Sequence, residues 1–286
     1  MTGDYKVACD IRCQLGEGPL WSQRENAVYW VDILAPALHR ISLDDHNIRS
    51  WPMPEKTGWV VERRAQPGFI GGLQSGFTEL TLEPFECRHI ADPEPQYPGN
   101  RMNDAKADHL GRIWAGTMDS EVREPLGSLY RLDRDFRVTR HDSGYMVTNG
   151  PAFSPARDWF YHSDTGRGIV YRFELTPEGQ VRNRKPFIQF PRDWGNPDGM
   201  TTDAEGGLWI AHWGGGRVSR FTPEGTLDRD VRLPASQITS CTFAGDNLDR
   251  MFVTSAADKR EDEPLAGVLF EIDPGARGLL TNLFDG

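Results

Sequence analysis

Six short segments rich in aromatic and β-branched residues recur along the chain at nearly constant intervals. They read AVYWVDI, GFIGGL, RIWAGTM, WFYHSD, GLWIAHW and RMFVTSA. Steps of 40, 44, 47, 48 and 43 residues separate their central apolar residues, which are Trp30, Ile70, Trp114, Tyr161, Trp209 and Phe252. A repeat of about 40–50 residues with several strands is typical of a β-propeller, in which each repeat forms one blade. The spacing therefore predicts an all-β, six-bladed β-propeller with four-stranded antiparallel blades around a central channel.

The remaining sequence favours strands over helices. Gly, Pro, Asp and Asn separate the segments, and no window of a dozen residues keeps the 3.6-residue period of an amphipathic helix. A β-sandwich of similar length is the alternative, but it would not produce six near-equal units. No linker divides the sequence, so we expect residues 1–286 to form a single propeller domain. A strand within residues 5–13 is expected to pair with C-terminal strands, because ring closure leaves no exposed sheet edge.

Charge and cysteine content bear on partners and compartment. The net charge of −10 disfavours nucleic acid and anionic membranes. No apolar run approaches the roughly 18 residues of a membrane span, and no protein partner is evident. Four scattered cysteines without a CxxC pair suggest a reducing compartment, and the N-terminus lacks the pattern of a signal peptide. These features predict a cytoplasmic protein that acts on a small molecule.

A second feature repeats in register with the blades. In each unit a turn precedes the aromatic strand, and the preceding strand begins five residues before that turn. In the fifth unit Asp203 opens the turn and Asp198 begins the strand. The corresponding six positions, which we call the ring positions, are Glu17, Val60, Asn103, Asn149, Asp198 and Thr239. Because innermost strands line the channel of a propeller, these side chains are expected to encircle its axis.

The chemistry of the ring positions points to a metal ion. Five of the six side chains carry oxygen, and two of them are carboxylates. Unpaired buried carboxylates are costly, and two that face one axis repel each other. A bound divalent cation would remove both problems. Hard oxygen donors suit Ca²⁺, Mg²⁺ or Mn²⁺ better than a dedicated Zn²⁺ site, although Zn²⁺ or Fe²⁺ can also occupy such a site. The alternative is that these polar residues only cap strands and turns.

Five stretches, taken in order, resemble the motif series of one family. They are LGEGPLW, RMNDAKADHLGRIWAGTM, TNGPAFSP, NPDGMTTDAEGGLWIA and FAGDNLDRMFVTSA, and they extend from about residue 13 to 275. The series resembles the SMP-30/gluconolactonase/LRE-like family, which includes regucalcin and bacterial sugar lactonases. The resemblance implies a six-bladed propeller with one divalent metal in the channel. Ca²⁺ is the first expectation, with Zn²⁺, Fe²⁺, Mn²⁺ and Mg²⁺ as alternatives. It also implies that Glu17, Asn149 and Asp198 are the metal ligands.

The resemblance also indicates residues that hold substrate. Arg101 and Asn103, in RMND, match the substrate-binding pair of the family. A further acid of the family falls on Glu121, and Asp119 competes for that role because the loop after GTMDSE is shorter than in the animal members. His212, Trp194 and Trp213 could also reach substrate, although a histidine or tryptophan buried within or between blades explains them as well.

The function that follows is hydrolysis of a sugar lactone to its aldonic acid. The metal would polarise the lactone carbonyl or activate water, and Asp198 would be the general base. No GxSxG motif indicates a serine esterase. Two alternatives remain open. One is a non-catalytic, divalent-metal-binding protein like regucalcin, and the other is a broader esterase or organophosphate hydrolase that uses the same site.

Overall fold

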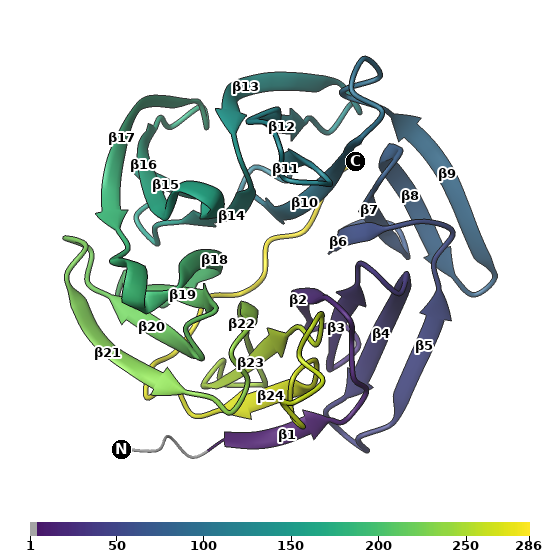
Figure 1. Cartoon of the computed structure of the whole chain (residues 1–286). Coiled ribbons are helices and arrows are strands. Elements are labelled where there is room, and N and C mark those ends of the chain that lie inside the picture. The colour runs from purple at the N-terminus through teal and green to yellow at the C-terminus, as the bar shows by residue number, and fades with distance from the viewer. Residues whose placement is uncertain (1–4) are drawn as a thin grey trace.

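The chain forms a ring of six antiparallel sheets around a central axis (Figure 1). A computed structural model describes residues 5–286, and each sheet contains four strands. Within residues 5–286 the only helical elements are two single 3₁₀ turns, η1 (Thr165–Arg167) and η2 (Arg192–Trp194). None of the helices in that range is long and apolar enough to cross a membrane. The predicted six-bladed β-propeller is confirmed.

Each blade runs from an innermost to an outermost strand. The first three blades are β2 (Gly16–Ser22), β3 (Ala27–Asp32), β4 (Ala37–Ser42), β5 (Ile48–Pro52); β6 (Thr57–Glu62), β7 (Phe69–Leu73), β8 (Gly76–Leu82), β9 (Phe85–Ala91); and β10 (Asn100–Ala107), β11 (Ile113–Asp119), β12 (Gly127–Leu132), β13 (Val138–Tyr145). The fourth and fifth blades are β14 (Thr148–Phe153), β15 (Trp159–Asp164), β16 (Ile169–Leu175), β17 (Val181–Gln189); and β18 (Asn196–Thr202), β19 (Leu208–Trp213), β20 (Arg217–Phe221), β21 (Leu227–Arg232).

The sixth blade joins the two ends of the chain. It contains β22 (Ile238–Ala244), β23 (Arg250–Ser255), β24 (Leu269–Ile272) and, outermost, β1 (Tyr5–Cys9). β1 pairs antiparallel with β24, and Tyr5 lies opposite Ile272. The predicted pairing of an N-terminal strand with C-terminal ones is therefore confirmed. It removes the exposed edge that an open ring of sheets would present.

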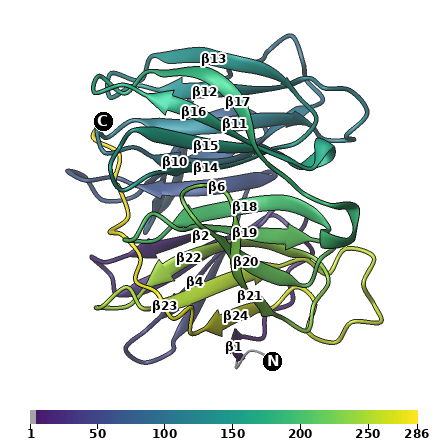
Figure 2. The same ribbon diagram turned by 90° about the vertical axis from the view of Figure 1, so that its left-hand side faces the viewer.

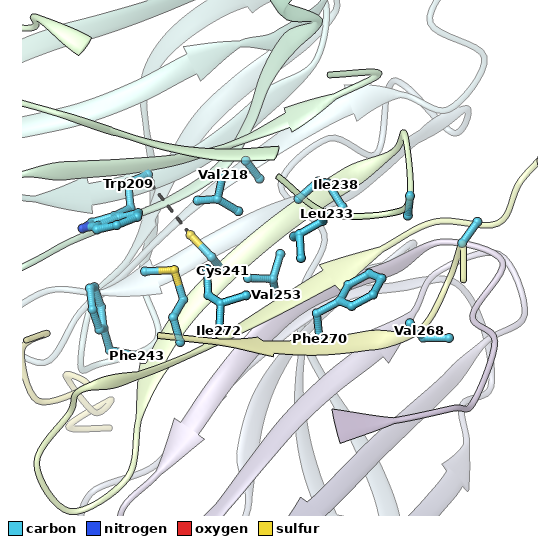
Figure 3. Packing of buried hydrophobic residues seen from close by; sticks show 14 residues of the cluster. Trp209, Val218, Leu233, Ile238, Cys241, Phe243, Val253, Val268, Phe270 and Ile272 are labelled. Carbon is cyan, nitrogen blue, oxygen red and sulfur yellow. Dashed lines mark hydrogen bonds between the residues drawn. The ribbon is translucent and has the colours of Figure 1, made fainter. Parts of the chain in front are cut away.

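The hydrophobic core lies between neighbouring blades. All six residues that defined the repeat lie on the second strand of a blade and are at most 2 % exposed. Figure 3 shows the contact between the fifth and sixth blades, where Trp209 and Val218 face Cys241 and Val253. The repeat is visible in the sequence because every blade needs a large apolar side chain at this position to cover its neighbour.

Asp108 and Asp203 occupy equivalent hairpins between the first and second strands of two blades. Asp203 accepts hydrogen bonds from the backbone N–H of Gly207 (2.8 Å) and from Trp209 Nε1 (2.9 Å). Asp108 likewise accepts from Trp114 Nε1 at 2.9 Å. The turn role predicted for Asp203 is confirmed, and its carboxylate ties the turn to the buried tryptophan of the same blade.

Residues 273–286 cross one end of the ring, from the sixth blade to the second and third blades (Figures 1 and 2). Near their end, the backbone N–H of Phe284 donates to Glu62 O at 2.9 Å, and that of Asp285 donates to Gly111 O at 3.0 Å. Phe284 is fully buried in the core of those two blades. We call this end of the channel the tail end. The opposite end, where the innermost strands begin, is the entry end.

Candidate metal and substrate site

All six ring positions lie on innermost strands, and their exposed fractions range from 0 to 6 %. In every blade the innermost strand shifts its register against the second strand at or next to the ring position. Such a bulge adds a residue and redirects side chains. The six ring positions thus lie beside a bulge of each inner strand, and that they encircle the axis stays a prediction.

A glycine follows each of the three predicted metal ligands. Gly18 and Gly150 have φ angles of 53° and 78°, which favour glycine. At Gly199 an added Cβ would lie 2.2 Å from Ser240 Oγ of the next inner strand. The glycines therefore permit both the bulged backbone and the close approach of neighbouring inner strands. This explains why Glu-Gly, Asn-Gly and Asp-Gly pairs recur at these positions.

Three buried carboxylates on inner strands interact with one another through their charges. Glu17, Asp104 and Asp198 are 5 %, 2 % and 4 % exposed, and no Lys, Arg or His within residues 5–286 forms an ion pair with any of them within 4.0 Å. Burial, and then the charge of Asp104, raise the pKa of Glu17 to about 8. Burial, and then the charges of Glu17 and Asp104, raise the pKa of Asp198 well above its usual value. Sequence reasoning missed Asp104.

A chain of hydrogen bonds orients the two asparagines. Arg101 Nη1 donates to Asn103 Oδ1 at 2.7 Å, and a guanidinium can only donate, so the amide oxygen of Asn103 faces Arg101. Asn103 Nδ2 then donates to Asn149 Oδ1 at 3.1 Å and to Thr148 O at 2.5 Å. Asn149 Nδ2 donates to Thr165 Oγ1 at 2.8 Å. The sequence-predicted Arg101, Asn103 and Asn149 are thus in direct contact.

The donor set fits a hard divalent cation. Glu17 and Asp198 supply carboxylate oxygens, and the hydrogen bonds of Asn149 orient its Oδ1 away from Thr165. Two buried carboxylates that form no ion pair within 4.0 Å are stabilised by a cation that binds both. Within residues 5–286 no three His, Cys, Asp or Glu side chains converge as a metal site by themselves. Asn149 would supply the third oxygen of the predicted set.

Comparisons with known proteins place this geometry in a family. A sequence model described as the SMP-30/Gluconolactonase/LRE-like region matches residues 15–257. The chain belongs to the SMP-30/gluconolactonase/LRE-like family. It is 37 % identical over 278 residues to a protein of Pseudomonas putida named 6-deoxy-6-sulfogluconolactonase, covering 95 % of each chain. It is 33 % identical over 292 residues to L-arabinolactonase of Azospirillum brasilense, covering 99 % of this chain and 96 % of that one.

Solved structures of the family share the fold. A calcium-binding protein, regucalcin, from Agrobacterium tumefaciens matches with a TM-score of 0.93 and 26 % identity, covering 99 % of this chain and 97 % of that one. The resemblance noted in the motifs is therefore confirmed at the level of family. The roles of individual residues remain predictions.

The two acids considered for the family's further substrate contact differ in environment. Asp119 accepts hydrogen bonds from the backbone N–H groups of Glu121 (3.1 Å) and Arg123 (2.9 Å), and these bonds, the one from Arg123 foremost, lower its pKa. It therefore holds the loop that follows β11. Glu121 lies exposed on that loop, and within residues 5–286 its carboxylate accepts no hydrogen bond from any site residue. The loop backbone already occupies the oxygens of Asp119, so Glu121 stays the predicted contact.

His212 lies in the interior of the fifth blade, and Trp194 packs beside it from η2, half-buried. His212 is fully buried, its Nδ1 lies 2.8 Å from Trp194 O, and its ring is 4.6 Å from that of Phe190. Burial lowers the pKa of His212 to about 4. Packing within and beside the fifth blade therefore accounts for these two residues. Trp213, at the end of β19, is half-buried.

Among residues 5–286, one cavity lies at each end of the ring. The larger, of about 540 Å³, is at the tail end and is lined by Asp104, Lys106 and residues 278–282, but not by Glu17, Asn149 or Asp198. The smaller, of about 240 Å³, is at the entry end and is lined by Arg101. Because Arg101 also contacts Asn103, the smaller cavity adjoins the candidate site.

Proposed function

We propose that this protein is a metal-dependent lactonase that hydrolyses a sugar lactone to the open-chain aldonic acid. The observation that carries the proposal is that the inner strands hold both buried carboxylates without an ion-pair partner and polar side chains that can bind a polyol. Glu17 and Asp198 lie on inner strands of the channel, as does the chain of hydrogen bonds from Arg101 to Asn149. Two relatives with substantial identity over nearly the whole chain are named as sugar lactonases, which supports the same reaction class.

Glu17, Asn149 and Asp198 would hold one divalent cation, with Ca²⁺ the first candidate by donor type. Zn²⁺, Fe²⁺, Mn²⁺ and Mg²⁺ are alternatives. When bound, such a cation polarises the lactone carbonyl and lowers the pKa of an adjacent water.

Asp198 is the proposed general base. Its carboxylate lies at the axis, and it takes a proton from the attacking water as the bond between the water oxygen and the carbonyl carbon forms. The ring C–O bond then breaks, and Asp198 gives the proton it took from the water to the departing oxygen, which becomes a hydroxyl group. Burial and the charges of Glu17 and Asp104 raise the pKa of Asp198, and a bound cation would lower that pKa and so favour the ionised carboxylate that a general base requires.

Arg101 and Asn103 are proposed to position the sugar. Nη1 of Arg101 donates to Asn103 Oδ1 and Met102 O, whereas within residues 5–286 Nε and Nη2 have no hydrogen-bond partner. Those donors can therefore reach oxygens of the substrate. The Nδ2 protons of Asn103 are already engaged, so Asn103 would chiefly accept a hydrogen bond from a substrate hydroxyl through Oδ1. Glu121 is proposed to accept from another hydroxyl at the mouth.

The direct test follows acid release from glucono-, galactono-, xylono- and arabinonolactone, with spontaneous hydrolysis subtracted. Protein stripped with a chelator is compared with protein restored by Ca²⁺, Zn²⁺, Mn²⁺, Mg²⁺ or Fe²⁺. We expect a rate on at least one lactone that the chelator abolishes and one of these ions restores. The absence of any chelator-sensitive rate on all four lactones would refute the proposal.

A non-catalytic role in binding calcium is the second candidate, because the solved relative from Agrobacterium tumefaciens is described as a calcium-binding protein. Calorimetric Ca²⁺ binding without turnover of any lactone would favour it.

Adding p-nitrophenyl acetate and paraoxon to the substrate panel tests the broader esterase or organophosphate hydrolase. A chelator-sensitive rate confined to those two compounds would favour that activity.

A further inference from the structure

The cavity of about 240 Å³ beside Arg101 is built by the second and third blades at the entry end. Its walls are the β5–β6, β7–β8 and β9–β10 connections, together with the start of β10 and the end of β11. Arg101 lines this cavity, and its charge also interacts with those of Glu17 and Asp198. A substrate whose reacting carbonyl lies at the axis can therefore extend its other end into this space.

The charges of the cavity are mainly negative. Glu55, Asp92 and Glu94 line it, and Arg101 is the only Lys, Arg or His among its lining residues. The positive charge of Arg101 is shared with Glu17 and Asp198 at the axis. The cavity away from the axis thus presents three carboxylates with no cation of its own.

Hydrogen bonds hold these carboxylates in place. Glu94 is 4 % exposed, and it accepts from Asn100 Nδ2 at 2.7 Å and from Tyr130 Oη at 2.9 Å. Glu55 accepts from Ser75 Oγ, and Asp92 Oδ1 accepts from the backbone N–H of Glu94 at 2.8 Å. A negatively charged ligand group would find these acids already fixed near it, and they could not turn away without losing the bonds.

The polar lining is also rich in acceptors. Asn100 is 5 % exposed and lines the cavity, and its Oδ1 has no hydrogen-bond partner within residues 5–286. Carboxylate and amide oxygens accept hydrogen bonds and donate none. Their natural complement is a group that donates, such as a sugar hydroxyl.

We propose that this cavity holds the hydroxylated end of an uncharged lactone and discriminates against lactones that carry a sulfonate or phosphate there. The inference rests on the proposed lactonase function and narrows its substrate class. It separates this chain from the relative named for a sulfonated lactone, despite their shared family. A charged group several ångströms from fixed carboxylates in a partly buried site is repelled strongly enough to change kcat/KM about tenfold or more.

The test uses the metal-loaded protein and three lactones that differ only at carbon 6, namely glucono-1,5-lactone and its 6-deoxy-6-sulfo and 6-phospho analogues. We expect kcat/KM to be at least about tenfold higher for the uncharged lactone. Raising the ionic strength to about 0.5 M should narrow that ratio, because salt screens exposed charges. The inference would be overturned if kcat/KM for the uncharged lactone were equal to or lower than kcat/KM for the charged ones.

Glu55→Gln then locates the effect. It removes one negative charge but keeps an oxygen that can accept from Ser75. We expect the ratio of kcat/KM for gluconolactone to kcat/KM for its sulfonated analogue to fall about threefold in this variant. The matched control is Glu86→Gln, which makes the same charge change on the outermost strand β9, outside the cavity, and should leave the ratio unchanged. An unchanged ratio in Glu55→Gln would contradict the assignment.

A binding measurement separates this inference from the proposed function. Calorimetry compares glucitol with glucitol 6-phosphate on the same metal-loaded protein, and we expect the uncharged polyol to bind more tightly. If no lactone is hydrolysed, the proposed function fails, but the binding comparison still decides the charge preference. Equal or tighter binding of the phosphorylated polyol would overturn the inference whether or not turnover is observed.

Discussion

Asp198 and Asp203 lie five residues apart in one blade, are both buried, and have opposite environments. Asp203 is 0 % exposed, and its carboxylate accepts hydrogen bonds from two backbone N–H groups, from Trp209 Nε1 at 2.9 Å and from Arg220 Nε at 2.7 Å. Asp198 is 4 % exposed, and its carboxylate forms no hydrogen bond or ion pair with another side chain within residues 5–286.

The difference separates a structural carboxylate from a functional one. A buried charge whose hydrogen bonds are all made rigidifies the fold, whereas one left without a partner costs stability and persists only because the surroundings hold it. Burial alone does not distinguish the two aspartates. The partners do, and a missing partner at the axis is the physical reason to expect a ligand there.

The largest expected effect is on Asp198. In Asp198→Asn, kcat/KM on the best lactone should fall by roughly 10³-fold or more, because a general base and a proposed metal ligand are lost together. The melting temperature of the metal-free protein should stay the same or rise, since a neutral amide replaces an unpaired buried charge. Near-normal turnover in this variant would end the assignment of Asp198 as the base.

Asp203 should show the opposite pattern. Asp203→Ala removes the partners of Trp209 and of two backbone amides and should lower the free energy of unfolding by about 3 kcal/mol, measured by urea denaturation. The control is Asp228→Ala, which removes a half-exposed partner of the same Arg220 and should cost less than about 1 kcal/mol. Equal losses in the two variants would mean that the buried hydrogen bonds of Asp203 contribute little.

Metal binding should stabilise the protein through Asp198 and not through Asp203. At a metal concentration one hundred times Kd, binding to the folded state alone adds about 2.7 kcal/mol to the free energy of unfolding. We expect that gain in the wild type and in Asp228→Ala, and its loss in Glu17→Gln and Asp198→Asn. Chelator-treated and metal-loaded samples are compared by denaturation. A full gain in Asp198→Asn would place the metal elsewhere.

The fold and the ring positions were predictable because both repeat. Each blade must bury a large residue such as Trp114 or Trp209, and each ring position lies on an innermost strand, five residues before the turn that follows it. Asp104 could not be found in this way. It lies next to a ring position, and strand alternation would turn it away from the channel, but the register shift between Met102 and Ala105 changes that alternation.

The cavity beside Arg101 was equally hidden from sequence reasoning. Glu55 and Glu94 lie on the connections before and after the second blade, and the folding of that blade brings them to one space. The hydrogen bonds of Asp119 to its loop depend on a local turn that the motif GTMDSE does not specify. Non-repeating loops carry these features, and neither periodicity nor spacing constrains them.

His162 separates two explanations of what makes a buried group functional. One is the lack of a hydrogen-bond partner, and the other is a charge that no opposite charge compensates. His162 is 0 % exposed between Tyr145 and Phe160, and both ring nitrogens lack a partner within residues 5–286. Burial, followed by the charge of Arg184, lowers its pKa to about 3. Unlike Asp198, it can stay neutral in the folded protein at pH 7, so its burial leaves no charge to compensate.

The sign of its pH effect follows from the two states. The unfolded histidine has an ordinary pKa near 6.5, so between pH 6.5 and 3 the unfolded chain binds the extra proton and stability falls as the pH falls. From pH 7.5 to pH 5 this amounts to ~2 kcal/mol. In His162→Phe that loss should be smaller by the same amount, as urea denaturation at the two pH values would show, while lactone turnover at pH 7.5 persists. Loss of turnover would instead show that a neutral unpartnered group can also be functional, and the distinction drawn from Asp198 and Asp203 would then fail.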